Sequence, residues 1–199
     1  MSQPTPLRIA LTPGEPAGIG PDIVVRLAQR AWPCEIVAVA DPRLLQERAA
    51  LLDLRLGLDN VDYDQPAQPG RLRVDPVALH SNVTPGQPDP ANAGYVLATL
   101  ERAVALCCSG RCDALVTGPV HKAVINDAGI AFSGHTDFLA AATGAEHVVM
   151  MLATAGLRVA LATVHIPLSA VSSALTRQRL EATIRVLHGD LRDRFGVVA

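Results

Sequence analysis

The sequence predicts an α/β fold in which a layered sheet is flanked by helices, and three observations support this. The 199 residues are 49% hydrophobic and 18% charged, which is the makeup of a globular chain with one sizeable core. Short β-branched runs alternate with helical patterns, as they do in layered α/β sheets. Several helical patterns also carry residues that favour helix ends.

Six short apolar runs are predicted strands, because they are rich in the β-branched residues that pack well on a pleated surface. In chain order they are residues 8–11, 35–40, 72–77, 114–117, 147–152 and 157–163.

Six segments between and after these runs are predicted helices. In chain order they are residues 21–30, 42–52, 91–108, 122–128, 136–142 and 177–195. Pro21 suits a first helical turn, and Gly196 lies where a left-handed cap should end the last helix. In that helix a core-facing stripe is expected, formed by Leu180, Ile184, Leu187, Leu191 and Phe195.

Composition excludes several classes of protein and leaves one organisational question open. A net charge of −2 without basic runs argues against nucleic acid as a partner. The start of the chain lacks a secretory signal and no stretch could cross a bilayer, so we expect a cytoplasmic protein without a membrane partner. Four cysteines match no metal spacing and are expected to be reduced. Residues 59–90 are rich in turn-forming residues and are a candidate subdomain edge.

Four loops at predicted strand ends or helix starts carry the candidate chemistry, and each has two interpretations. Residues 12–22 (TPGEPAGIGPD) are either a tight strand-to-helix turn or a ligand loop at a helix N-terminus. In residues 117–122 (TGPVHK), Lys122 is either solvated or binds an anion. In residues 133–137 (SGHTD), Thr136 either caps a helix or helps to hold a phosphate. His165, after a strand, is either a hydrogen-bonded structural residue or a metal ligand.

Taken together, four motifs in this order closely resemble the 4-hydroxythreonine-4-phosphate dehydrogenase family of pyridoxal phosphate biosynthesis. They are residues 12–21, 117–122, 134–136 and 163–168 (TVHIPL). The resemblance implies an isocitrate/isopropylmalate dehydrogenase-like α/β fold and a homodimer. It also implies an oxidation of 4-phosphohydroxy-L-threonine by NAD or NADP, with decarboxylation to 3-amino-2-oxopropyl phosphate.

The same resemblance assigns the site residues. His135 and Thr136 correspond to substrate-binding positions, and His165 to one of three histidine ligands of a divalent metal. Glu15 and Lys122 lie in family motifs and are candidate catalytic residues. An imidazole ligand favours zinc, with cobalt or magnesium as alternatives.

The chain departs from the family in its length. Family members continue into a further portion that holds the other two metal histidines, so residues 1–199 are expected to be the N-terminal portion of a single dehydrogenase, incomplete at the C-terminus. We expect this segment to be inactive alone. Two alternatives stay open: a dehydrogenase of a related phosphorylated four-carbon acid, threonate or erythronate 4-phosphate, and a non-catalytic phosphate-binding fragment.

Overall fold

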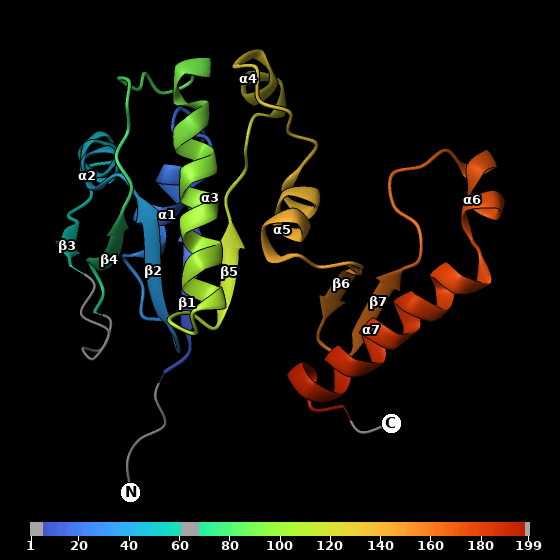
Figure 1. The fold of residues 1–199 in the computed structure, drawn as a ribbon. Coiled ribbons are helices and arrows are strands. Elements are labelled where there is room, and N and C mark those ends of the chain that lie inside the picture. The colour runs from blue at the N-terminus through green and yellow to red at the C-terminus, as the bar shows by residue number, and fades with distance from the viewer. Residues whose placement is uncertain (1–5, 61–67, 198–199) are drawn as a thin grey trace, which may run out of the picture. The chain divides into compact units, whose positions relative to one another are not determined.

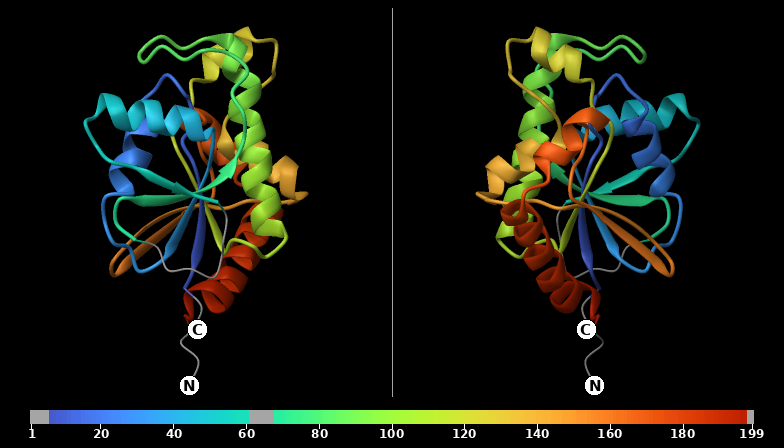
Figure 2. Two further views of the ribbon diagram at one scale, coloured as in Figure 1. Left: turned by 90° about the vertical axis from the view of Figure 1, so that its left-hand side faces the viewer. Right: turned by 90° about the vertical axis from the view of Figure 1, so that its right-hand side faces the viewer.

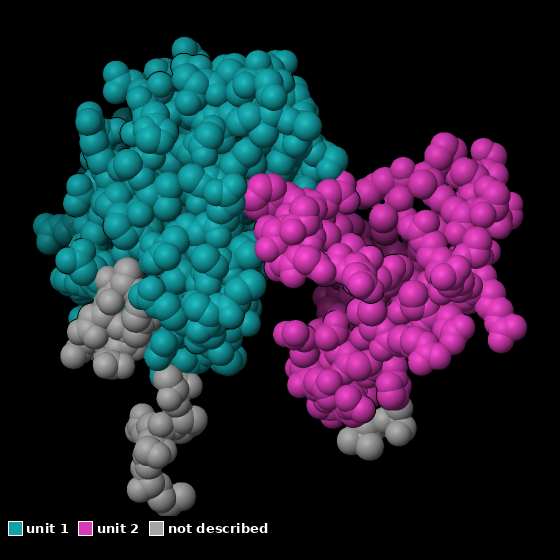
Figure 3. All heavy atoms as spheres, in the orientation of Figure 1, with its two compact units in different colours: residues 1–134 teal, residues 135–199 magenta. Residues whose placement is uncertain are grey.

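The computed structural model describes residues 6–60 and 68–197. It has two compact units, Met1–Gly134 and His135–Ala199, which are shown in different colours in Figure 3. Each unit is described by itself below.

The first unit is built on a parallel sheet whose strand order is β3-β4-β2-β1-β5. The strands are β1 (Arg8–Thr12), β2 (Glu35–Ala40), β3 (Gly57–Asp59), β4 (Arg71–Pro76) and β5 (Ala114–Thr117). In the register, Ala10 lies beside Val37 of β2 on one side and Leu115 of β5 on the other. β1 is therefore paired with β2 on one side and with β5 on the other.

Helices cover both faces of this sheet (Figures 1 and 2). The helices are α1 (Gly20–Leu27), α2 (Pro42–Leu51), the short 3-10 helix η1 (Pro90–Asn92), α3 (Ala93–Cys108) and α4 (Lys122–Asp127). On one face Ala38 and Ala40 pack with Val24 of α1 and Leu45 of α2. On the other face Val37 and Val39 pack with Ala103 and Leu106 of α3. Because β2 is buried on both faces, its sequence EIVAVA is almost continuously apolar.

The second unit is the smaller one. It contains α5 (His135–Thr143), the antiparallel pair β6 (Met150–Thr154) and β7 (Leu157–Leu161), α6 (Leu168–Ala174) and α7 (Arg177–Phe195). Among its described residues only Thr183 is buried, and its hydroxyl lies 2.9 Å from Nε2 of His147. Arg158 of β7 stacks over the ring of Phe195, 4.9 Å from its centre.

Most predicted elements are found, with shifted ends. β2, β5 and α7 have the predicted bounds, Pro21 lies in the first turn of α1, and Gly196 ends α7 in the left-handed conformation. The predicted strand 147–152 begins three residues later in the structure, and the strand 157–163 ends two residues earlier. Two elements, β3 and α6, were not predicted.

Three members of the stripe expected on α7 are exposed in this chain. Leu180, Ile184 and Phe195 are 43%, 54% and 41% exposed. A two-stranded sheet offers too little apolar surface to bury one face of a 19-residue helix.

Two further expectations concern the whole chain. The four cysteines are free thiols, as predicted, and no helix in the described ranges has the length and apolarity that a membrane span requires. The subdomain edge expected within residues 59–90 stays a prediction, and residues 61–67 of it lie outside the described part of the chain.

Candidate functional site

The first two candidate loops meet at the carboxyl ends of β1 and β5, where the strands of the first unit are connected toward opposite sides of the sheet. From β1 the chain runs through α1 to β2 on one side, whereas α3 leads to β5 on the other side. The loops after β1 and β5 are therefore neighbours, joined by Gly118 N–H to Thr12 O (2.7 Å) and Glu15 N–H to Pro119 O (2.9 Å). In open α/β sheets this position, at the carboxyl ends of the strands, is where ligands bind.

The glycines in these loops are required by close backbone contacts, both between the two loops and within the first one. A Cβ on Gly14 would overlap the carbonyl oxygen of Pro119, and one on Gly118 or Gly20 would overlap that of Pro13. Gly14 also has φ +76°, a conformation that favours glycine. These contacts support the interpretation of residues 12–22 as a tight structural turn, since the glycines are already used by the protein's own backbone.

A buried arginine holds the same turn from the other side. Arg48 of α2 is 5% exposed and donates to the carbonyl oxygens of Pro16 and Gly18, each at 3.0 Å. It also pairs with Asp22 in the first turn of α1, at 2.5 Å. Asp22 complements the helix dipole there, and its ion pair with Arg48 helps to hold the turn. Sequence reasoning missed Arg48, although a charged residue beside Leu44 and Leu45 on the packed side of a helix was a usable signal.

Glu15 is the buried acid of this edge. Its side chain is 6% exposed and accepts a hydrogen bond from Ala17 N–H at 3.1 Å. Burial raises the pKa of the Glu15 carboxyl, and Asp89 adds to this, whereas the Ala17 hydrogen bond and His121 oppose it. The structure thus brings Glu15 and His121 into electrostatic range, a pairing that the sequence did not reveal.

His121 and Lys122 open α4, as the sequence predicted. The His121 ring caps the helix by accepting from Val124 N–H at 3.3 Å, so its Nδ1 is the acceptor and Nε2 is free to carry the proton. Lys122 is exposed, and its Nζ would lie 3.2 Å from a Cβ on Gly134. The ammonium therefore lies against the backbone that leads into α5.

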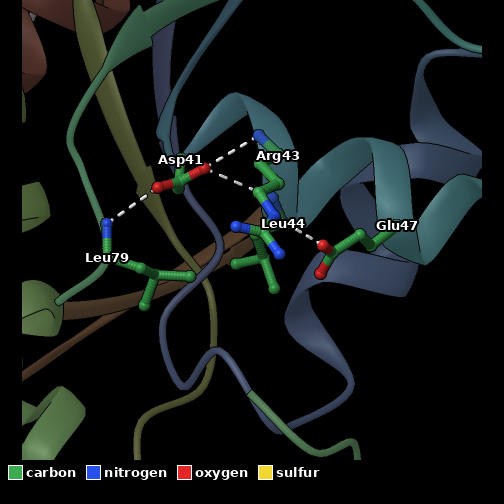
Figure 4. A network of polar contacts seen from close by, with 5 residues as sticks. All are labelled: Asp41, Arg43, Leu44, Glu47 and Leu79. Atoms are coloured by element: carbon green, nitrogen blue, oxygen red, sulfur yellow. Dashed lines mark hydrogen bonds and ion pairs between the residues drawn. The ribbon is translucent and has the colours of Figure 1, made fainter. Parts of the chain in front are cut away.

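Asp41, at the carboxyl end of β2, shows how the next loop is fixed (Figure 4). Its Oδ1 accepts from Arg43 and Leu44 N–H, which caps α2, and its Oδ2 accepts from Leu79 N–H at 2.8 Å. In dinucleotide-binding sheets of the Rossmann type an acid near this position binds the ribose hydroxyls. Both oxygens of Asp41 are instead used by backbone groups, so Asp41 has a structural role.

In the second unit, the two predicted substrate-binding residues begin α5. The helix starts at His135, so Thr136 is its second residue and is not the N-cap. His135 is half-buried and Thr136 is exposed. The exposed Thr136 hydroxyl therefore lies in the first turn of α5.

His165 lies in the loop between β7 and α6. It is exposed and has φ +55°, which is uncommon for a residue with a side chain and often marks a functional position. Within residues 6–60 and 68–197, no three His, Cys, Asp or Glu side chains are grouped so that they could hold a metal ion. These residues alone therefore do not make a metal centre, and His165 can supply one ligand at most.

Comparison with known proteins agrees with the motifs. Residues 32–199 match the model of the family described as pyridoxal phosphate biosynthetic protein PdxA. The chain is 56% identical over 193 residues to a protein of Citrobacter koseri and 55% identical to one of Serratia proteamaculans, both named 4-hydroxythreonine-4-phosphate dehydrogenase. The match covers 96% of this chain but only 59% and 58% of those relatives.

Solved structures show the same fold. A 4-hydroxythreonine-4-phosphate dehydrogenase from Klebsiella pneumoniae matches with a TM-score of 0.86 and 30% identity, over 94% of this chain and 59% of that one. A terephthalate 1,2-cis-dihydrodiol dehydrogenase from Burkholderia xenovorans matches with a TM-score of 0.67 and 27% identity, over 90% and 55%. With the family model matching most of its length, the chain belongs to the pyridoxal phosphate biosynthetic protein PdxA family.

Proposed function

We propose that this chain is part of a dehydrogenase that oxidises 4-phosphohydroxy-L-threonine with NAD or NADP and decarboxylates the product to 3-amino-2-oxopropyl phosphate. The observation that carries the proposal is 56% identity, over 96% of the chain, to a relative named for this substrate. The fold is proposed to be of the isocitrate/isopropylmalate dehydrogenase type, and the complete enzyme is proposed to be a homodimer.

The start of α5 is the proposed binding place for the substrate phosphate. The dipole of α5 favours an anion there, and the exposed Thr136 hydroxyl supplies a donor. His135 supplies an imidazole from the same turn. Because hydrogen bonds to charged groups contribute about 1.5–3 kcal/mol, a few such donors suffice to select a phosphorylated substrate.

Glu15 and Lys122 are the candidate catalytic residues of the first unit. Burial raises the pKa of the Glu15 carboxyl above that of an exposed glutamate, which is the direction that suits a general acid or base. Lys122 is an exposed ammonium at a strand-to-helix loop, where it is available to an anionic group.

His165 is proposed as one ligand of a divalent metal, for which zinc is favoured over cobalt or magnesium. The described residues do not fit a complete metal site. The remaining ligands would come from the length of the relatives that this chain does not span, and for this reason we propose that the 199 residues alone are inactive.

The test is a hybrid in which this chain replaces the matching part of the Citrobacter koseri relative, so that the rest of the relative's length is supplied. Reduction of NAD or NADP is followed with 4-phosphohydroxy-L-threonine, threonate 4-phosphate and erythronate 4-phosphate. The highest kcat/KM should belong to 4-phosphohydroxy-L-threonine. A clear preference for one of the other acids would assign the chain to the sibling activity, and a folded hybrid without turnover would favour the non-catalytic alternative.

A further inference from the structure

The segment between α4 and α5 is anchored by one amide side chain. Asn126 of α4 accepts from Phe132 N–H at 2.9 Å and donates back to Phe132 O at 3.3 Å. The same amide nitrogen donates to Lys122 O at 2.9 Å, within its own helix. The Asn126 amide therefore pairs with Phe132 as a neighbouring strand would, using both its donor and its acceptor.

This anchor fixes the backbone only three residues before α5 begins. Phe132 is 6% exposed, so both its side chain and its backbone are fixed. Only Ser133 and Gly134 separate it from His135, and three residues span at most about 10 Å. Gly134 in turn lies against the Lys122 ammonium. The backbone that leads into His135 and Thr136 thus leaves α4 from a defined point.

We propose that Asn126 is a positioning residue for the substrate phosphate, acting through the backbone of residues 132–136. The inference rests on the proposed phosphate site at the start of α5. Asn126 itself does not touch the substrate in this account. Its two bonds to Phe132 reduce the conformations open to the segment, so that less ordering remains to be done when the phosphate binds.

The sequence offers a closely matched control in Gln29. Its amide nitrogen donates to Val25 O, four residues earlier, at 3.2 Å, and to Arg55 O across a loop at 3.1 Å. Asn126 makes the same kind of pair, four residues back and across a loop. Asn126 is exposed, so its replacement by alanine leaves no cavity in the core. Both variants should fold, and they differ in whether the loop leads to the phosphate site.

The experiment uses the hybrid described above with Asn126→Ala or Gln29→Ala. KM for 4-phosphohydroxy-L-threonine and the inhibition constant of inorganic phosphate are measured together with kcat and KM for the dinucleotide. We expect Asn126→Ala to raise KM for the phosphorylated substrate and the inhibition constant of phosphate about tenfold each, which corresponds to the loss of roughly one hydrogen bond. The dinucleotide KM should change less than about twofold, and Gln29→Ala should leave all four constants near their starting values.

Amide-hydrogen exchange in the 199-residue chain supplies a readout that does not need turnover. Exchange at residues 132–136 should be faster in Asn126→Ala and unchanged in Gln29→Ala. If the unsubstituted hybrid turned over and Asn126→Ala matched Gln29→Ala in every constant, the inference would be wrong while the proposed function stood. If the unsubstituted hybrid were folded but inactive, the proposed function would fail, and unchanged exchange in Asn126→Ala would then overturn the inference by itself.

Discussion

The contact between the loops after β1 and β5 gives the sharpest stability prediction. Gly14→Ala places a Cβ 2.8 Å from the carbonyl carbon of Pro119 and 2.9 Å from that of Gly118, where ordinary contacts are about 3.5–4 Å. The left-handed backbone costs a residue with a side chain about 1–2 kcal/mol. Moving the Pro119 carbonyl away costs a further ~1–3 kcal/mol of overpacking. It also weakens the bond from Glu15 N–H, which contributes about 0.5–1.5 kcal/mol.

Gly110→Ala is the matched control, because Gly110 has φ +71° but nothing within 4 Å of an added Cβ. It should lose only the backbone cost of about 1–2 kcal/mol, so Gly14→Ala should be less stable than Gly110→Ala by about 1.5–4.5 kcal/mol. Urea unfolding followed by fluorescence measures this, since the single tryptophan, Trp32, lies in the first unit. Equal losses in the two variants would refute the close packing of the loops.

Three further predictions concern charged and polar groups. Arg48→Met should lower the free energy of unfolding by about 3–5 kcal/mol in the same urea assay, because the Asp22 carboxylate and two carbonyl oxygens lose their partner. A loss below ~1 kcal/mol would contradict the role of Arg48 in holding the turn. Since the pKa of Glu15 is raised above its ordinary value of 4.5 in the folded chain, its ionisation weakens the fold as pH rises through that raised pKa. Glu15→Gln should therefore gain stability relative to the unchanged protein between pH 4.5 and neutrality, and a difference independent of pH would count against burial as the cause. In the hybrid, Thr136→Val should raise KM for the phosphorylated substrate by the equivalent of about 1.5–3 kcal/mol, and an unchanged KM would place the phosphate elsewhere.

The sheet of the first unit could be predicted well because its strands carry local signals. β2 and β5 are short apolar runs that lie between helical patterns, and their bounds follow from composition alone. β3 has only three residues, including a glycine and an aspartate, so nothing in its sequence distinguishes it from a turn. It is a strand because β4 pairs with it, and this pairing joins residues that are far apart in the sequence.

The second unit was harder to predict because the spacing of its apolar residues does not show which of them are buried. The spacing of Leu180 and Ile184 is that of a core-facing helix, yet both are exposed in the described structure. α6 has no side-chain cap and a serine-rich sequence, so it carries no start signal.

The candidate site was predictable as a set of motifs and not as a geometry. The loops that hold Glu15, Lys122, His135, Thr136 and His165 were predicted from their places after strands or at helix starts, and the roles of these residues came from the family resemblance. The residues that fix those loops were not, because their partners lie far away in the sequence, as in Arg48 with Gly18 or Asp41 with Leu79. Asn126 acts over only six residues, but an exposed asparagine at a helix end is too common a feature to attract notice.

The role of His165 as a metal ligand is tested by metal-dependent turnover of 4-phosphohydroxy-L-threonine in the hybrid, with and without His165→Ala. The unchanged hybrid, stripped of metal and then given zinc, should reduce the dinucleotide. His165→Ala should fold with the same urea midpoint but bind zinc weaker by orders of magnitude, since even changes to groups behind a ligand cost roughly 10- to 100-fold. Its turnover should fall in parallel. If His165→Ala bound zinc and turned over substrate as well as the unchanged hybrid, the assignment of this chain's metal ligand, and the account built on it, would be contradicted.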